Sequence, residues 1–248
     1  MTRKSGEISI NELVGEAPAK AAWTQRRTWL GTVYHQRVND VTAFVLAGGK
    51  STRMGKDKAF LELGGETLLE RTLSVAKSVT DDVLVVGDPA KFGQHGRVVE
   101  DIYPDRGPLG GIHAALTQTQ TDFNLVLAVD IPFVERRFLD FLISDALTGE
   151  AEVTVPRTEG FLHPLCAIYR RGFAAVSEKA LIRGQNKIDT LFASVRTRVI
   201  EEEELTHLGF RSDMFRNLNT PEEWAAARAW CKQNEKTDDL SLENERSQ

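Results

Sequence analysis

The chain has 248 residues, of which 31 are Lys or Arg and 36 are Asp or Glu, with a formal net charge of -5 and 41% hydrophobic residues. This composition is typical of a globular protein with one large domain or at most two. It excludes a transmembrane protein, because the longest apolar stretches, such as Leu125 to Val129, are too short to cross a bilayer. The basic residues near the N-terminus are followed by no continuous apolar segment, so no secretory signal is expected and the protein is predicted to be cytoplasmic.

The two ends of the chain differ in composition from its middle. Residues 1–40 show neither a helical nor a strand period and are expected to form an extension that is poorly ordered or peripheral. Residues 232–248 are polar and almost free of apolar side chains, which is typical of a disordered tail. The main domain is therefore predicted at 41–231. Because acidic residues outnumber basic ones there, we expect neither nucleic acid nor a membrane surface as a partner.

Short apolar runs alternate with helical patterns along this domain. In chain order they predict a strand at 41–47, a helix at 68–79, strands at 83–86 and 98–99, a helix at 109–116, a strand at 125–129, a helix at 135–147, strands at 153–156 and 164–169, a helix at 173–182, a strand at 197–200 and a helix from Thr220 to Trp230. Near-continuous Val/Leu strands between amphipathic helices indicate an α/β fold with a mostly parallel sheet and helices on both faces. The later strands mix apolar and polar positions, so the sheet is expected to become mixed at one edge.

Glycine is concentrated in one part of the chain: eleven of the 19 glycines lie between positions 48 and 111. The loop 48–58 follows the first predicted strand, which is where ligands bind in open α/β sheets. A P-loop is excluded because its first glycine would fall on Phe44, and no GxGxxG spacing is present. The glycines and four cations of this loop suit a polyphosphate, and a solvated basic turn is the plainer alternative. The cations are Lys50, Arg53, Lys56 and Lys58.

Five segments together resemble the molybdopterin nucleotidyltransferase family, and within it the molybdenum cofactor guanylyltransferases. They are LAGGKSTRMGKDKAFLELGGETLLER at 46–71, VED with GPLGG at 99–111, VDIP at 129–132, HPLCAIY at 163–169 and NLNTPEE at 217–223. The resemblance implies a Rossmann-like nucleotidyltransferase fold that uses GTP, Mg2+ and molybdenum-molybdopterin and releases pyrophosphate. It also suggests other cofactor-pathway proteins or apo-molybdoenzymes as partners.

The resemblance also implies roles for individual residues. It assigns GTP contacts to Leu46, Ala47, Gly48, Lys58, Asp101 and Asp130, catalysis to Arg53, Lys58 and Asp130, the Mg2+ ion to Asp130, and a less settled place at the edge of the active site to Asn217 and Asn219. From the residues alone we add Gly49, in the glycine loop, and Gly110, in a turn whose free N–H groups are able to meet the base or ribose. A plain helix start is the alternative for this turn. The stretch after the strand at 83–86 offers no polar side chain at the position where the family has a nucleotide contact.

The chemistry of nucleotidyl transfer agrees with this residue set. Both reactants are anions and a terminal phosphate is already ionised, so the protein must position the reactants and neutralise their charge rather than supply a base. Asp130 leaves the most apolar strand, where a carboxylate is costly unless it has a cationic partner, although a turn or helix cap is an alternative.

Other readings remain open for the acceptor and for the activity itself. His163, Arg183 and Lys187 are candidates for the acceptor phosphate, and for each the plainer alternative is a surface position. The alternatives to guanylyl transfer are a related transferase that uses CTP or a sugar-phosphate acceptor, and a GTP-binding adaptor with a decayed active site.

Overall fold

The computed structural model describes residues 40–48, 57–220 and 222–229 of the chain. All of them belong to the unit Val38–Gln248, whereas the unit Met1–Arg37 lies outside the described residues. The predicted extension, apart from Asp40, and the predicted tail therefore also lie outside them. Among the described helices, none combines the length and the apolar character needed to span a membrane.

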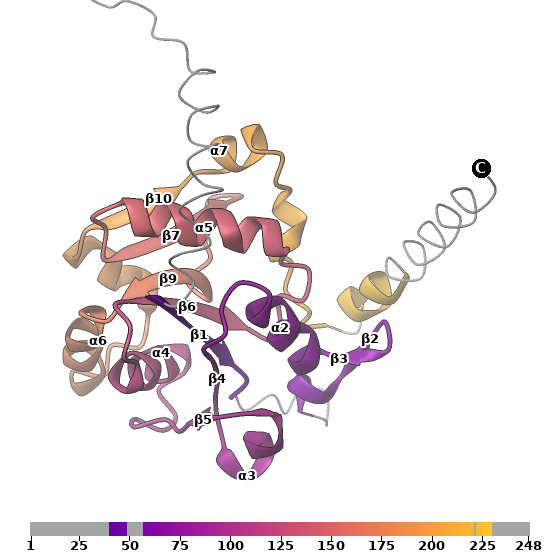
Figure 1. The fold of residues 1–248 in the computed structure, drawn as a ribbon, viewed down its shortest axis with the longest axis horizontal. Coiled ribbons are helices and arrows are strands. Elements are labelled where there is room, and N and C mark those ends of the chain that lie inside the picture. The colour runs from indigo at the N-terminus through magenta and orange to yellow at the C-terminus, as the bar shows by residue number, and fades with distance from the viewer. Residues whose placement is uncertain (1–39, 49–56, 221, 230–248) are drawn as a thin grey trace, which may run out of the picture. The chain divides into compact units, whose positions relative to one another are not determined.

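The described residues form an eight-stranded sheet in which most strands run parallel (Figure 1). Its order is β10-β7-β9-β6-β1-β4-β5, and β8 pairs with β7 off this path. The strands are β1 (Val41–Leu46), β4 (Val83–Val86), β5 (Val98–Val99), β6 (Phe123–Ala128), β7 (Val153–Thr158), β8 (Phe161–Leu162), β9 (Cys166–Arg170) and β10 (Thr197–Ile200). The predicted α/β fold with a mostly parallel sheet is confirmed.

The mixed pairing is concentrated on β9, which runs antiparallel to both of its neighbours, β6 and β7. It lies inside the sheet, between these two strands, rather than at the edge, and the edge strand β10 is parallel to β7. The reason is the short connection between β7 and β9, which folds through the small strand β8 and has no room for the crossover helix that a parallel pair requires.

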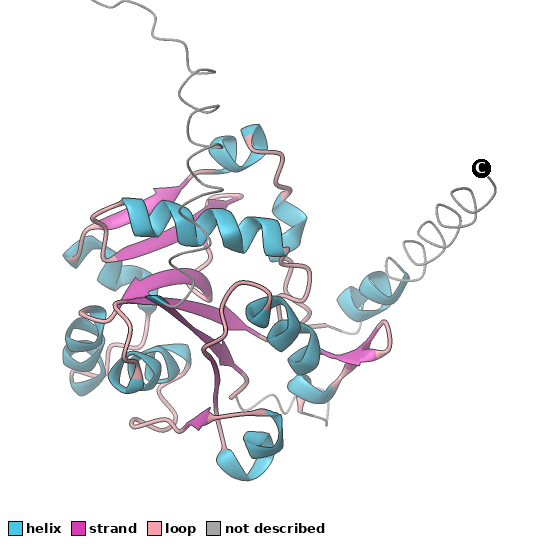
Figure 2. Ribbon diagram, in the orientation of Figure 1, coloured by secondary structure: helices cyan, strands magenta, loops and turns pink. Residues whose placement is uncertain are grey.

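Helices cover both faces of the sheet (Figures 1 and 2). Apolar side chains of α2 (Leu68–Lys77) and α5 (Arg136–Thr148) are buried against one face, and those of α4 (Pro108–Gln118) and α6 (Phe173–Ile182) against the other. The strands β1 and β6 are almost fully buried between these layers, which explains their continuous apolar sequences. The expectation of helices on both faces is confirmed.

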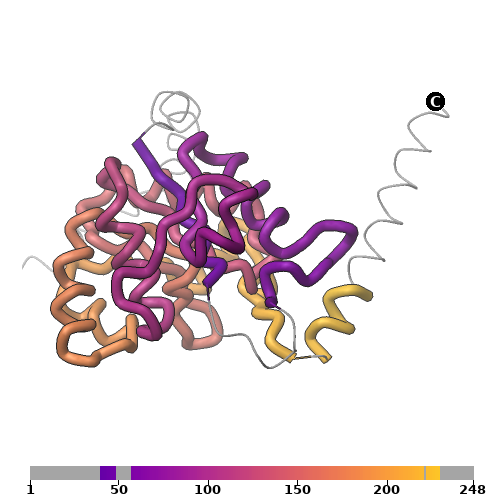
Figure 3. The backbone as a smooth tube through the Cα atoms, turned by 90° about the horizontal axis from the view of Figure 1, so that it is seen from below, coloured from indigo at the N-terminus to yellow at the C-terminus, as the bar shows by residue number. Residues whose placement is uncertain are grey.

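Several short elements connect these layers. They are the hairpin strands β2 (Glu62–Leu63) and β3 (Glu66–Thr67), the helices α3 (Pro89–Phe92) and α7 (Glu202–His207), and the 3-10 helices η4 (Lys58–Phe60), η5 (Gly93–His95), η6 (Ile188–Ser194) and η7 (Ser212–Phe215). Residues 222–229 are helical as well. Figure 3 shows the yellow segment before this last helix running beside the start of the purple tube at η4, so two segments that are far apart in the sequence lie side by side.

Candidate active site

The parallel strands β1, β4 and β6 end at the same edge of the sheet, and the first candidate residues lie there. The N–H groups of Ala47 and Gly48 both donate to the carbonyl of Val86, at 3.1 Å each. A Cβ atom added to Gly48 would lie 3.5 Å from the Cα atom of Gly87. The backbone segments that follow β1 and β4 are therefore in close contact as they leave the sheet. Because these N–H groups bond within the protein, a ligand contact from this segment would use its carbonyl oxygens.

Three predicted residues from distant parts of the chain meet at this edge. The Lys58 ammonium donates to Oδ2 of Asp130 at 3.1 Å and to Oδ1 of Asn219 at 2.7 Å. The Lys58 and Asp130 side chains are 13% and 26% exposed, so the pair is largely shielded yet reachable from solvent. We call Lys58, Asp130 and Asn219 the edge cluster. It places a cation, a carboxylate and an amide where the fold binds ligands.

Local structure explains how Lys58 reaches this position. Asp57 caps η4, since its Oδ1 accepts from the Ala59 N–H at 3.2 Å. The other carboxylate oxygen of Asp57 pairs with Lys91 of α3 at 3.2 Å. The chain that enters the edge cluster is therefore held by a cap and by an ion pair just before Lys58.

The backbone of the Asn219 segment is held from two sides. The Leu218 N–H donates to the Asp130 carbonyl at 3.1 Å, and the Leu218 side chain is fully buried. Oε2 of Glu223 accepts from the N–H groups of Asn219 and Thr220 at 2.5 and 2.8 Å, and the Thr220 hydroxyl accepts from the Glu223 N–H at 3.2 Å. These are the two halves of a capping box, which confirms the predicted cap at Thr220.

From the sequence, Glu223 is expected only as an acidic residue in the first turn of a helix. Its carboxylate accepts backbone N–H bonds and feels the positive charge of Lys58, and both effects lower the pKa of Glu223 below its ordinary value. The signal in the sequence was the NTPEE motif itself, in which Glu223 stands at the third helical position. That position predicts a helix cap, but it does not reveal that Asn219, whose N–H group donates to Glu223, also bonds to Lys58.

Asp101 is a partly buried carboxylate near the same edge. Its Oδ1 is fully buried and accepts no hydrogen bond from the residues that the structure describes. Burial, with a smaller contribution from Glu100, raises the pKa of Asp101 above its ordinary value. A Cβ atom added to Gly111 would lie 3.5 Å from this oxygen and 3.3 Å from the Leu46 side chain. The first turn of α4 therefore packs directly against Asp101 and the end of β1.

Gly110, the glycine singled out in the sequence, has a packing role in the structure. Its N–H donates to the Gly107 carbonyl at 3.1 Å, and an added Cβ atom would lie 3.0 Å from the Tyr103 carbonyl. The neighbouring Gly111 is the one that lies against Asp101. A GTP contact from Gly110 stays a prediction.

His163 lies at the ligand edge because β9 runs antiparallel, which brings the start of that strand to the end of β6. The Ala128 N–H donates to the Leu165 carbonyl at 2.9 Å. The His163 ring stacks on Phe215 with a centroid distance of 4.2 Å, and its Nε2 lies 2.7 Å from the Thr158 hydroxyl. Burial lowers the pKa of His163 to about 4. Without a bound anion the ring is therefore neutral at physiological pH, and it offers a hydrogen-bonding group at this edge.

The other acceptor-side candidates are exposed. Arg183 ends α6 and Lys187 precedes η6, and a Cβ atom on Gly184 between them would lie 4.0 Å from the Arg106 guanidinium. Asn217 is also exposed and lies two residues before Asn219. In the described part of the chain, no hydrogen bond or ion pair joins Arg183 or Lys187 to the edge cluster.

Two predicted site residues lie outside the described residues, and the structure explains why the stretch after β4 has no polar contact to offer. Gly49 and Arg53 lie outside the described residues. After β4, a Cβ atom on Gly87 would lie 2.7 Å from the Phe92 ring, and the Asp88 carboxylate caps α3 by accepting from the Ala90 N–H at 2.9 Å. The residues after β4, where the family has a polar nucleotide contact, are thus used for tight packing and for a helix cap.

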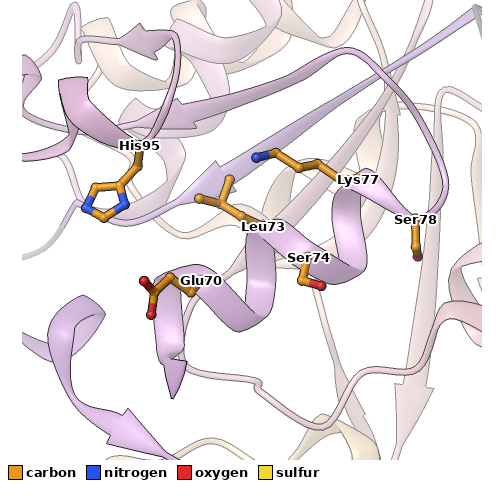
Figure 4. A pocket seen from close by; sticks show the side chains of 6 residues that line it. All are labelled: Glu70, Leu73, Ser74, Lys77, Ser78 and His95. Carbon is orange, nitrogen blue, oxygen red and sulfur yellow. The ribbon is translucent and has the colours of Figure 1, made fainter. Parts of the chain in front are cut away.

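A hollow elsewhere on the surface takes no part in this site. It has a volume of about 500 Å³ and follows one face of α2 (Figure 4). Its lining residues are Glu70, Leu73, Ser74, Lys77, Ser78 and His95. Within the described ranges, no group of three or more His, Cys, Asp or Glu residues is arranged to hold a metal ion.

A doubly covered α/β sheet with a cation and a carboxylate at its ligand edge agrees with a nucleotidyltransferase. Residues 43–199 match the family described as the MobA-like NTP transferase domain. The chain belongs to this family, which confirms the resemblance found in its sequence motifs.

Named relatives and a solved structure agree with the family. A probable molybdenum cofactor guanylyltransferase from Clostridium perfringens (strain 13 / Type A) is 33% identical over 187 residues, which cover 74% of this chain and 93% of the relative. A molybdenum cofactor guanylyltransferase from Desulfosudis oleivorans is 34% identical and covers 77% and 96%. The crystal structure of molybdopterin-guanine dinucleotide biosynthesis protein A from Archaeoglobus fulgidus superposes with a TM-score of 0.69 at 25% identity and covers 77% and 99%.

Proposed function

We propose that the protein transfers GMP from GTP to molybdenum-molybdopterin, forming the guanine dinucleotide form of the cofactor and releasing pyrophosphate. The observation that carries the proposal is the edge cluster, in which Asp130 and Asn219 hold the Lys58 ammonium at the carboxyl edge of the sheet. The names of the relatives supply the choice of GTP and molybdopterin.

The proposed role of Lys58 follows from the charges of the reactants. A phosphate oxygen of the acceptor attacks the α-phosphorus of GTP and expels pyrophosphate, so negative charge accumulates on the leaving group. An ammonium has three donors, and Asp130 and Asn219 engage it from the protein side. A remaining donor can bind the β- and γ-phosphates, and this stabilises the departing charge. Arg53, outside the described residues, would add a second cation.

The proposed Mg2+ site rests on Asp130. Mg2+ in phosphoryl-transfer sites is held by one or two carboxylates together with phosphate oxygens and water, rather than by a protein cage. Asp130 fits this pattern, because its hydrogen bond to Lys58 uses Oδ2 and the side chain is 26% exposed. Asp130 would hold the ion, and a bound Mg2+ would supply positive charge against the charge that develops on the phosphates.

The burial of the Asp101 carboxylate supports a binding position for the nucleoside beside this residue. Asp101 is a half-buried carboxylate whose pKa is raised by burial, and a guanine N–H or a ribose hydroxyl bonded to it would offset the cost of that burial. The Ala47 and Gly48 carbonyls, at the end of β1, would be able to accept the same kind of donor. His163, Arg183, Lys187 and Asn217 remain candidates for the acceptor side.

The test is a comparison of nucleotides with one acceptor. Purified protein is incubated with Mg2+, molybdenum-loaded molybdopterin and GTP, CTP, ATP or UTP in turn, and both pyrophosphate and the dinucleotide mass are measured. We expect product with GTP alone. A preference for CTP would refute the choice of nucleotide, and GTP binding without turnover would support the adaptor alternative. A parallel incubation with GTP and a sugar phosphate in place of molybdopterin tests the acceptor, and turnover only there would refute it.

A further inference from the structure

The connection between the edge cluster and the C-terminal helix passes through one carboxylate. Oε2 of Glu223 accepts from the Asn219 N–H at 2.5 Å, and Oδ1 of Asn219 accepts from the Lys58 ammonium at 2.7 Å. Glu223 is thus one residue away from the cation of the edge cluster, although it lies on the helical stretch 222–229 and forms no direct contact with Lys58 in the described structure.

We propose that Glu223 is a positioning residue for the polyphosphate of GTP. It holds the backbone of Asn219 so that the Asn219 amide oxygen orients the Lys58 ammonium. This inference rests on the proposed function, because it assumes that Lys58 binds the β- and γ-phosphates.

The geometry shows why such a clamp is needed. A lysine side chain is long and flexible, so the direction of the third donor of Lys58 depends on how firmly the other two are held. Asp130 leaves a rigid strand, whereas Asn219 lies in an exposed connection between η7 and the helical stretch 222–229. The buried Leu218 anchors the residue before Asn219, and Glu223 anchors Asn219 itself.

The charge on Glu223 adds to this effect. Backbone N–H bonds and the nearby Lys58 charge keep the pKa of Glu223 low, so its carboxylate is ionised at neutral pH. Hydrogen bonds to an ionised acceptor are stronger than those to a neutral one, which makes Glu223 a firmer clamp than an uncharged cap.

Thr220 offers a matched control, because it forms the other half of the same capping box. Its hydroxyl accepts from the Glu223 N–H at 3.2 Å and caps the helix without bonding to Asn219. Thr220→Ala therefore weakens the helix start and leaves the Glu223 bond to Asn219 in place. If Glu223 acted only by capping the helix, Thr220→Ala and Glu223→Ala would have the same effect.

The experiment measures the dissociation constants of GTP and GMP by calorimetry, with Mg2+, for the full chain and its variants. GMP lacks the β- and γ-phosphates, so it reports any loss that does not involve them. We expect Glu223→Ala to weaken GTP about tenfold, which is the scale of one hydrogen bond to a charged group, and to leave GMP unchanged. Glu223→Gln should restore most of the affinity, since its amide oxygen still accepts. Thr220→Ala should change neither constant.

A second variant keeps the inference testable if Glu223→Ala does not fold. Asn219→Ala removes the amide that contacts Lys58 and should produce the same loss, selective for GTP. Equal loss of GTP and GMP in Glu223→Ala, or normal GTP binding by either Glu223→Ala or Asn219→Ala, would overturn the inference. Absence of GTP binding by the unaltered protein would instead refute the proposed function, so the two failures are distinguishable.

Discussion

The replacement Asp130→Ala separates the contribution of the edge cluster to stability from its contribution to chemistry. The variant loses the Lys58–Asp130 ion pair at 3.1 Å, in which both side chains retain some solvent exposure. A pair of this kind contributes up to about 1 kcal/mol. The Asp130 carbonyl still accepts from the Leu218 N–H, so the loop keeps its backbone anchor. For a domain of this size we expect the melting temperature to fall by roughly 2–4 °C.

The effect of Asp130→Ala on catalysis should be much larger. The change removes the proposed Mg2+ ligand and one of the two groups that hold Lys58. Loss of a single group that stabilises transition-state charge lowers turnover by about 10²–10³-fold, and here one change disturbs two such groups. We therefore expect pyrophosphate release with GTP, Mg2+ and molybdopterin to fall by at least about 10²-fold.

A matched control lies at the opposite end of the same strand. Asp122, just before β6, pairs with Arg170 at 3.0 Å. Asp122→Ala also removes a single partly exposed ion pair, so it should lower the melting temperature by a similar amount and leave pyrophosphate release unchanged. A folded Asp130→Ala protein with the turnover of the unaltered protein would refute this reasoning, as would an Asp122→Ala protein equally inactive.

Three further changes test other parts of the site. Asp101→Asn removes a partly buried charge whose pKa is raised by burial, so the ligand-free protein should melt at a higher temperature above that pKa and bind GTP more weakly in calorimetry. Gly87→Ala places a methyl group 2.7 Å from the Phe92 ring, and denaturant unfolding should show a loss of about 1–3 kcal/mol from overpacking; a neutral result would contradict the packing described at this strand end. His163→Phe keeps the stack on Phe215 but cannot titrate. The folded protein holds His163 neutral down to about pH 4, whereas the unfolded chain takes up the proton near pH 6.5, so stability should decrease from pH 6.5 to 4 in the unaltered protein, and thermal melts should show a smaller decrease in the variant.

Much of the fold could be predicted because its strands and helices carry strong local patterns. The strand at Val41–Leu46 is buried along its whole length, and its apolar run reports this directly. The hairpin of β2 and β3 and the helix α3 were missed, because two-residue strands and a four-residue helix are too short to show a period. The reversed strand β9 was expected only as a mixed edge, since its place between β6 and β7 depends on strand order rather than on local sequence.

The members of the edge cluster could be named from sequence motifs, but their arrangement in space could not be predicted. Lys58 and Asp130 are 72 positions apart, and Lys58 and Asn219 are 161 apart. Each belongs to a recognisable motif, yet no local pattern states that the three meet. The same limit applies to Glu223, whose capping signal is local while its connection to Lys58 is made across the sheet edge.

The reversed direction of β9 also affects how the ligand edge can change during evolution. Loops that follow the parallel strands reach this edge as the chain leaves the sheet. β9 instead delivers residues 163–165 to it as the chain arrives, and departs at the opposite edge, where Arg170 pairs with Asp122. Side chains beside His163 can therefore vary without altering the loops that carry Asp101 and Asp130, so a change in one part of this edge does not require a change in the other.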